Sequence, residues 1–130
     1  AIETWEKALA KDPNLINIQV NLSSLLIQQK QFDRAERLLK DIQGKDPKLE
    51  PSVLLNLASL YFAQGKWNET LEKLKHLEQL QPQNYFVKEQ MAVVYYYMGN
   101  IEKARELIQT CQKANHPINP QFLYLLEQKK

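Results

Sequence analysis

Histidine and cysteine, two of the side chains that often carry catalysis, number only two and one in this sequence and do not form a recognised arrangement. Cys111 and His116 lie close together in the chain and could pair as a thiol nucleophile and its general base. His76 stands beside Lys73 and Lys75, without a second His at the spacing that a metal site needs. The sequence also has no glycine-rich phosphate-binding loop. We therefore expect no metal site and no cofactor, and Cys111 remains as the catalytic candidate to explain.

Three consecutive tyrosines, Tyr95, Tyr96 and Tyr97, could offer ring faces on which nucleic-acid bases stack. On a helix, however, successive side chains point about 100° apart, so the three rings cannot form one surface. We assign Tyr95 to the core, and we assign Tyr96 and Tyr97 to a surface that contacts protein.

The composition fits a folded domain without a strongly charged surface. Of 130 residues, 44% are hydrophobic and 25% are charged, and 17 basic against 15 acidic side chains give a net charge of +2. That charge is too small to imply a phosphate-binding surface by itself. No apolar run approaches the roughly 18 residues of a membrane span, so we expect no direct membrane insertion. A single cysteine excludes an internal disulfide but indicates no compartment, and localisation is not predicted.

A repeat of 34 or 35 residues organises the chain. Successive units are closed by four prolines, Pro13, Pro47, Pro82 and Pro117. Other residues follow the same period, among them Gly65 with Gly99 and Tyr61 with Tyr95. Within each unit, apolar residues recur at helical spacing in two blocks, so each unit is expected to be a pair of helices. No strand is predicted.

The spacing predicts helices over residues 1–11, 16–29, 32–44, 52–64, 67–80, 85–98, 101–114 and 119–129. Gly65 and Gly99 stand just after the first helix of their pair, where a left-handed residue favours glycine. Lys30 occupies the equivalent position of an earlier unit, and a side chain there costs about 1 kcal/mol. We therefore expect either slight strain or another turn geometry at Lys30. The second helices are expected to be capped by Asp33, Asn68 and Asn100.

The units resemble the tetratricopeptide repeat, a 34-residue helix-turn-helix with small residues where its helices cross and Pro near its end. In residues 16–49 the matching positions are Leu22, Ser23, Leu26, Phe32, Ala35, Leu39 and Pro47. Those of the two later units are Leu57, Ala58, Tyr61, Gly65, Trp67, Leu74 and Pro82, then Met91, Ala92, Tyr95, Gly99, Ile101, Ala104 and Ile108. The resemblance places Cys111 on the buried seam where the family has Ala, so we interpret its thiol as structural.

The resemblance implies an all-α fold in which tandem helix-turn-helix repeats stack as a right-handed α-solenoid. One domain would cover residues 1–130, with full repeats at 16–49, 50–84 and 85–118. Residues 1–15 would supply the second helix of a truncated repeat, and residues 119–130 the first helix of another. We therefore expect the chain to be part of a longer repeat protein.

In this family the first helices line an inner groove, and the resemblance implies the same role for the corresponding helices here. The predicted groove residues are Val20, Asn21, Ser24, Ile27, Leu55, Asn56, Ser59, Phe62, Phe86, Gln90, Val93, Tyr96, Tyr97 and Tyr124. They are aromatic, aliphatic, hydroxyl-bearing or amide-bearing, and none is basic. One subgroup of the family grips acidic peptide tails with Lys, Asn and Arg side chains. Only Asn56 of that set is present here, so an acidic ligand is not expected.

The resemblance and the groove composition together predict a non-catalytic scaffold that binds an apolar or amphipathic peptide or helix of a partner protein. Two alternatives are left open. Helical repeats of 35 residues also build RNA-binding arrays, but these need a basic groove, and we expect no nucleic acid as partner. The chain could instead be the substrate-selecting arm of an enzyme whose catalytic domain lies elsewhere. The partnerless helix at 1–11 and the apolar residues 122–126 also predict that both ends are covered, either by adjacent repeats of a longer protein or by a second copy stacked end to end.

Overall fold

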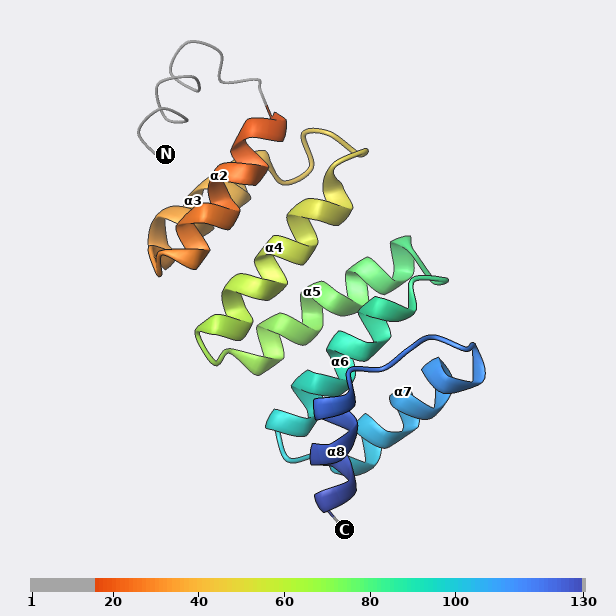
Figure 1. The fold of residues 1–130 in the computed structure, drawn as a ribbon. Coiled ribbons are helices and arrows are strands. Elements are labelled where there is room, and N and C mark those ends of the chain that lie inside the picture. The colour runs from red at the N-terminus through yellow and green to blue at the C-terminus, as the bar shows by residue number, and fades with distance from the viewer. Residues whose placement is uncertain (1–15, 130) are drawn as a thin grey trace. The chain divides into compact units, whose positions relative to one another are not determined.

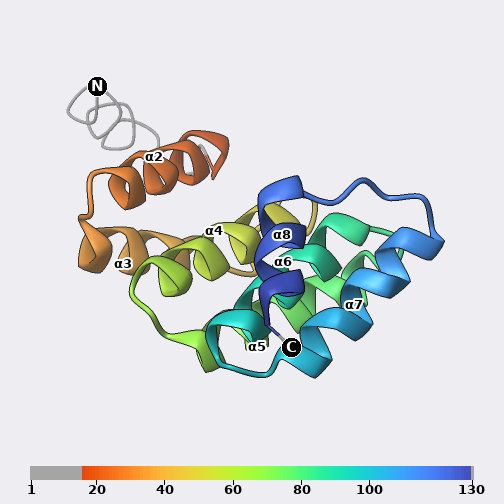
Figure 2. The same cartoon turned by 60° about the horizontal axis from the view of Figure 1, so that its bottom comes forward.

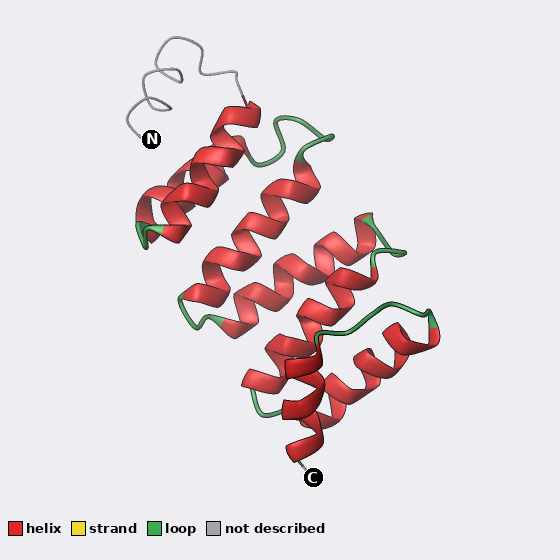
Figure 3. Cartoon of the chain, in the orientation of Figure 1, coloured by secondary structure: helices red, strands yellow, loops and turns green. Residues whose placement is uncertain are grey.

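The computed structural model describes residues 16–129, and all regular secondary structure in that range is α-helical (Figure 3). The helices labelled in Figure 1 are α2 (Ile16–Gln28), α3 (Phe32–Ile42), α4 (Glu50–Ala63), α5 (Trp67–Leu80), α6 (Tyr85–Tyr97), α7 (Ile101–Lys113) and α8 (Pro120–Gln128). Each of them overlaps a helix predicted from the repeat, so the all-α prediction is confirmed. The helix predicted over residues 1–11 lies outside the described residues.

The chain divides after Lys66 into two compact units, which we call the N-unit (up to Lys66) and the C-unit (from Trp67). Helices α2, α3 and α4 belong to the N-unit, and α5, α6, α7 and α8 belong to the C-unit.

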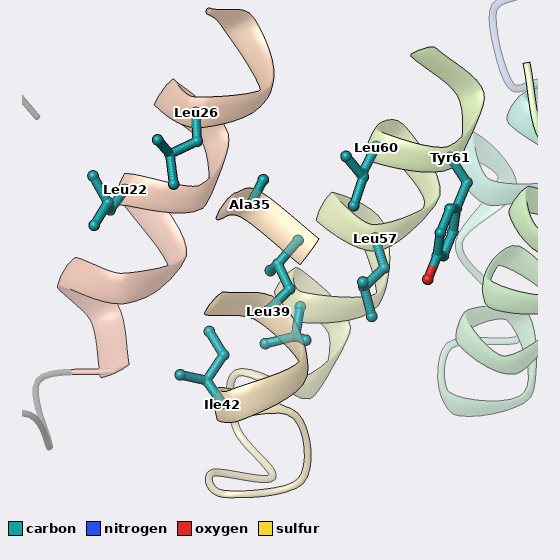
Figure 4. Close-up of a cluster of buried hydrophobic side chains, with 9 residues drawn as sticks. Leu22, Leu26, Ala35, Leu39, Ile42, Leu57, Leu60 and Tyr61 are labelled. Atoms are coloured by element: carbon teal, nitrogen blue, oxygen red, sulfur yellow. The ribbon is translucent and has the colours of Figure 1, made fainter. Parts of the chain in front are cut away.

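In the described part of the N-unit, α4 packs against both members of the α2–α3 hairpin. The shared core, shown in Figure 4, consists of Leu22 and Leu26 of α2, Ala35, Leu39 and Ile42 of α3, and Val53, Leu57, Leu60 and Tyr61 of α4. Ala35 is fully buried, and its small side chain lets α3 approach its neighbours closely. Truncating one of the large aliphatic side chains in such a core typically costs roughly 2–5 kcal/mol, so this cluster holds the three helices together.

In the C-unit, α6 is the central helix, because it packs against α5 and forms a hairpin with α7. Ala92 of α6 and Ala104 of α7 are fully buried, as expected for residues at a close helix crossing. Helix α8 lies beside α6 and α7 in both views (Figures 1 and 2). It buries Phe122 and Leu126, and Arg105 of α7 donates a hydrogen bond to the Leu126 carbonyl at 3.0 Å. Helix α8 is therefore held in place by the burial of apolar side chains and by a charge-assisted hydrogen bond.

The same hydrogen-bonded turn ends four of the described helices. After α2, the amide of Lys30 donates to Ile27 O at 3.0 Å, and the next amide donates to Leu26 O at 2.8 Å. The equivalent left-handed residues after α4, α6 and α7 are Gly65, Gly99 and Asn115, with φ of 73°, 86° and 62°. Lys30 itself has φ 62°. Of the two outcomes expected at Lys30, the structure therefore has the strained one, since this residue keeps the backbone geometry that favours glycine.

The predicted caps of the second helices are only partly correct. Asn100 precedes α7, and its side chain accepts a hydrogen bond from the Lys103 amide at 3.2 Å, as predicted. Asp33 is wrong as a cap, because α3 follows Gln31 and Asp33 lies inside its first turn. A carboxylate in that turn instead interacts favourably with the helix dipole. Asn68 is the second residue of α5 and is not its cap either.

Candidate functional site

The predicted groove residues of the N-unit lie on α2 and α4, the first helices of their pairs. Their exposure differs: Asn21 and Ser59 are exposed, while the half-buried set is Val20, Ser24, Ile27, Leu55, Asn56 and Phe62. Val20 and Ile27 also pack against the buried core of the N-unit. These two side chains therefore serve the fold as well as any surface that they form.

Asn56 joins two helices of the N-unit. Its Nδ2 donates to the Val20 carbonyl at 3.2 Å and to Ser23 Oγ at 3.1 Å. Ser23 is fully buried and in turn donates to Val20 O at 2.6 Å, so the three groups form a small network between α2 and α4. A ligand could therefore reach the Oδ1 atom of Asn56, whereas its amide protons are already used within the N-unit.

In the C-unit, four of the predicted residues gather at one place. Gln90, Val93, Tyr96 and Tyr97 of α6 line a hollow of about 220 Å³, which is completed by Glu89, Asn119, Gln121, Phe122 and Leu125. We call this space the α6–α8 hollow. Phe86 and Tyr124, with 45% and 62% of their surfaces exposed, do not line it. Tyr124 borders a second, more open hollow on α8 with Pro120, Gln121 and Leu125.

A series of aromatic rings leads from the start of α5 to the α6–α8 hollow. Trp67, the first residue of α5, stacks on Tyr97 with centroids 5.5 Å apart and planes 14° apart. Tyr97 meets Tyr96 edge-on at 5.6 Å, and Tyr96 meets Phe122 edge-on at 5.7 Å. Tyr95 is buried, as predicted. Because Tyr96 and Tyr97 lie with their planes 81° apart, these two rings do not form the parallel platform that base stacking uses.

Helix α6 also carries a buried carboxylate, Glu89, at a position that faces the groove in the repeat register. Glu89 is only 8% exposed, and its two oxygens have different partners. Oε1 lies 3.0 Å from Nε2 of His116, and Oε2 accepts a hydrogen bond from the Asn119 amide at 3.1 Å. The sequence sets this position apart, because the equivalent position of the preceding repeat is the aliphatic Leu55. A charge at an apolar repeat position indicates a buried polar network.

Comparison with known protein families identifies these repeats. Residues 1–60 and residues 52–84 each match a family model described as tetratricopeptide repeat. The chain belongs to the tetratricopeptide repeat family. Repeats of this family are generally protein-interaction scaffolds and are typically non-catalytic.

A solved structure shares the fold of this chain. The chain is similar to the crystal structure of BtubC (BKLC) from P. vanneervenii, with a TM-score of 0.59 and 20% sequence identity. The match covers 88% of this chain and 54% of that chain, so our sequence spans about half of the related structure. No curated protein matches the sequence.

Within this tetratricopeptide chain, Cys111 is placed where a catalytic thiol could not act. It is 0% exposed, and its Sγ donates to the Tyr85 carbonyl at 3.5 Å. Burial raises the pKa of the thiol, and the nearby charge of Glu89 raises it further. Since the thiolate is the reactive form, Cys111 is held in the unreactive state. His116, its proposed base, is directed through Nε2 to Glu89.

Residues 16–129 contain no group of three or more His, Cys, Asp or Glu side chains that could hold a metal ion. None of the helices in this range combines the length and apolarity needed to cross a bilayer.

Proposed function

We propose that this tetratricopeptide chain binds an apolar or amphipathic segment of a partner protein on the exposed faces of its first helices. In the C-unit that face belongs to α6 and α8, and in the N-unit to α2 and α4. The α6–α8 hollow is the observation that carries the proposal. Its walls are formed by aromatic and amide side chains. Four of its lining residues are among those predicted, from the repeat register, to face the groove.

The chemistry of the α6–α8 hollow suits such a segment. Tyr97 has 54% of its surface exposed and stacks on Trp67, which limits the rotamer freedom that it would lose on binding. Rigid aromatic side chains of this kind are frequent binding hot spots. The amides of Gln90 and Gln121 could pair with the backbone of the bound segment.

Peptide selection followed by affinity measurement tests the proposal. The full chain would be panned against a random peptide library, and the enriched peptides would be titrated by fluorescence anisotropy. We expect apolar or amphipathic peptides whose affinity falls about tenfold or more with Tyr97→Ala. Gln109→Ala, an exposed change on α7, is the matched control and should leave affinity unchanged.

Three results would contradict the proposal. They are the absence of any enriched peptide, equal binding by Tyr97→Ala and the wild type, and tight binding of single-stranded RNA that weakens steeply with added salt. The last result would instead favour an RNA-binding repeat array.

End-to-end self-association is a second proposal, favoured by the face of α8 that carries Tyr124 and Leu125. These side chains are 62% and 41% exposed and line one open hollow together, so they form an exposed apolar patch and are not isolated residues. Multi-angle light scattering over a range of concentrations should show oligomers that Tyr124→Ser weakens. A strictly monomeric chain at high concentration would refute this proposal.

A further inference from the structure

The residues that line the α6–α8 hollow carry a net negative charge. Glu89 is its single acidic lining residue, and none of the described residues that line it is Lys or Arg. The remaining lining is aromatic, aliphatic or amide-bearing. A carboxylate that is largely removed from water needs compensation by hydrogen bonds or by an opposite charge.

The internal partners of Glu89 satisfy only part of that need. A carboxylate has about four acceptor positions, and here His116 Nε2 and the Asn119 amide occupy two of them. The Asn119 amide carries no charge, and the imidazole of His116 compensates the charge of Glu89 only when it is protonated. Room therefore remains on Glu89 for a cationic donor that enters from the α6–α8 hollow.

The aromatic walls favour the same kind of group. The faces of Tyr and Phe rings attract a cation that lies within about 6 Å of the ring centroid. Tyr96 and Phe122 both line the hollow and meet edge to face, with planes 84° apart, so the contact covers a face of one ring only and leaves the faces of the other ring outside it. The hollow thus combines a carboxylate with π faces, which is the arrangement that suits an ammonium or guanidinium group.

We propose that the α6–α8 hollow binds a basic side chain, Lys or Arg, of the amphipathic segment that the chain recognises. This inference rests on the proposed function and adds the charge of the ligand to it. The volume of about 220 Å³ is below the roughly 300–1,000 Å³ of pockets for drug-sized ligands, so one side chain is the appropriate occupant. Apolar neighbours of that basic residue would contact Tyr97.

Titration with small amino-acid derivatives tests this inference on the full chain. The probes are the Nα-acetyl amides of arginine, lysine, norleucine and glutamate, added at low salt and pH 8, where an ordinary imidazole is neutral. NMR would follow the ring signals of Tyr96 and Phe122 and the Asn119 amide. We expect the arginine and lysine derivatives to bind more tightly than norleucine amide, and the glutamate derivative not to bind.

Two variants identify the source of the preference. Glu89→Gln should weaken arginine amide binding about tenfold, as loss of a charge-assisted hydrogen bond predicts, and should leave norleucine amide unaffected. Glu106→Gln, on the exposed surface of α7, is the matched control. If Glu89→Gln disturbs folding, Tyr96→Leu provides a second measurement, because it removes a π face and keeps the carboxylate.

The outcomes separate this inference from the proposed function. Equal affinity for norleucine and arginine amides would overturn the inference, and so would arginine binding that survives Glu89→Gln in a folded variant. Enriched peptides that depend on Tyr97 but contain no basic residue would uphold the proposed function and refute the inference.

Discussion

Replacing Lys30 with glycine should stabilise the N-unit. Lys30 has φ 62°, a left-handed conformation that costs an L-residue roughly 1–2 kcal/mol. Glycine removes that cost but gains conformational freedom in the unfolded chain, which offsets roughly 0.5–1 kcal/mol of the benefit. The expected net gain is therefore about 0.5–1 kcal/mol.

The turn around Lys30 supports this estimate. Both hydrogen bonds of the turn use backbone atoms, so Lys30→Gly retains them. Gly65 and Gly99 occupy the same turn position with φ of 73° and 86°, and a Cβ added to either would meet nothing within 4 Å. The reverse changes Gly65→Ala and Gly99→Ala should thus cost about 1 kcal/mol through the backbone alone.

Urea denaturation and thermal melting measure the effect of Lys30→Gly. The midpoint should rise without a change in the m-value, and Tm should rise by roughly 2–4 °C. Lys30→Ala is the matched control, since it also removes the charge but keeps the left-handed penalty. Equal stability of the Gly and Ala variants would refute the reasoning, because the gain could not then come from φ.

Three other predictions concern packing, pH dependence and reactivity. Ala104 is fully buried, so Ala104→Leu should cost about 1–3 kcal/mol in urea denaturation, whereas Ala63→Leu, on an exposed position of α4, should be mild. The Tyr61 hydroxyl donates to Glu36 at 2.8 Å and, ahead of Lys40, holds the pKa of that carboxyl below its usual value. Because the pKa of Glu36 is lower in the folded than in the unfolded chain, its ionised form stabilises the fold at neutral pH. This stabilisation is lost as the pH falls through the folded-state pKa. Tyr61→Phe should therefore destabilise by about 1 kcal/mol at pH 7, with a difference from wild type that shrinks under acidic conditions. Cys111 should react with a disulfide reagent only as fast as the chain unfolds, and rapid labelling of the native protein at pH 8 would contradict its burial.

The helices were predictable because the repeat period, the apolar spacing and the turn glycines all indicate the same boundaries. The turn after α2 was the exception, since Lys30 lacks the glycine signal, and only the backbone shows which of two geometries it takes. Asp33 was mistaken for a cap because Asp is favoured both at the N-cap and in the first turn of a helix, where it lies in α3. The residue types therefore predicted the presence of each helix better than they predicted its first and last residues.

The candidate site was less predictable, because side-chain partners come from different repeats. The register selects Gln90, Val93, Tyr96 and Tyr97, which lie together on α6. It does not indicate that the side-chain amide of Asn56 donates a hydrogen bond to α2. Nor does it indicate that Glu89 accepts a hydrogen bond from the residue before α8. Such pairings depend on where helices distant in the chain come to lie, and a repeat pattern does not contain that information.

The hydrogen bond from the Asn119 amide to Glu89 has a consequence for the order in which the C-unit assembles. Helix α8 has nine residues, too few to be stable alone, and Asn119 caps its start through bonds from the Gln121 and Phe122 amides. Its first turn is thus tied to a side chain already buried on α6. In native-state hydrogen exchange, the α8 amides should open before those of α6 and α7, and on refolding they should be the last of these three helices to gain protection.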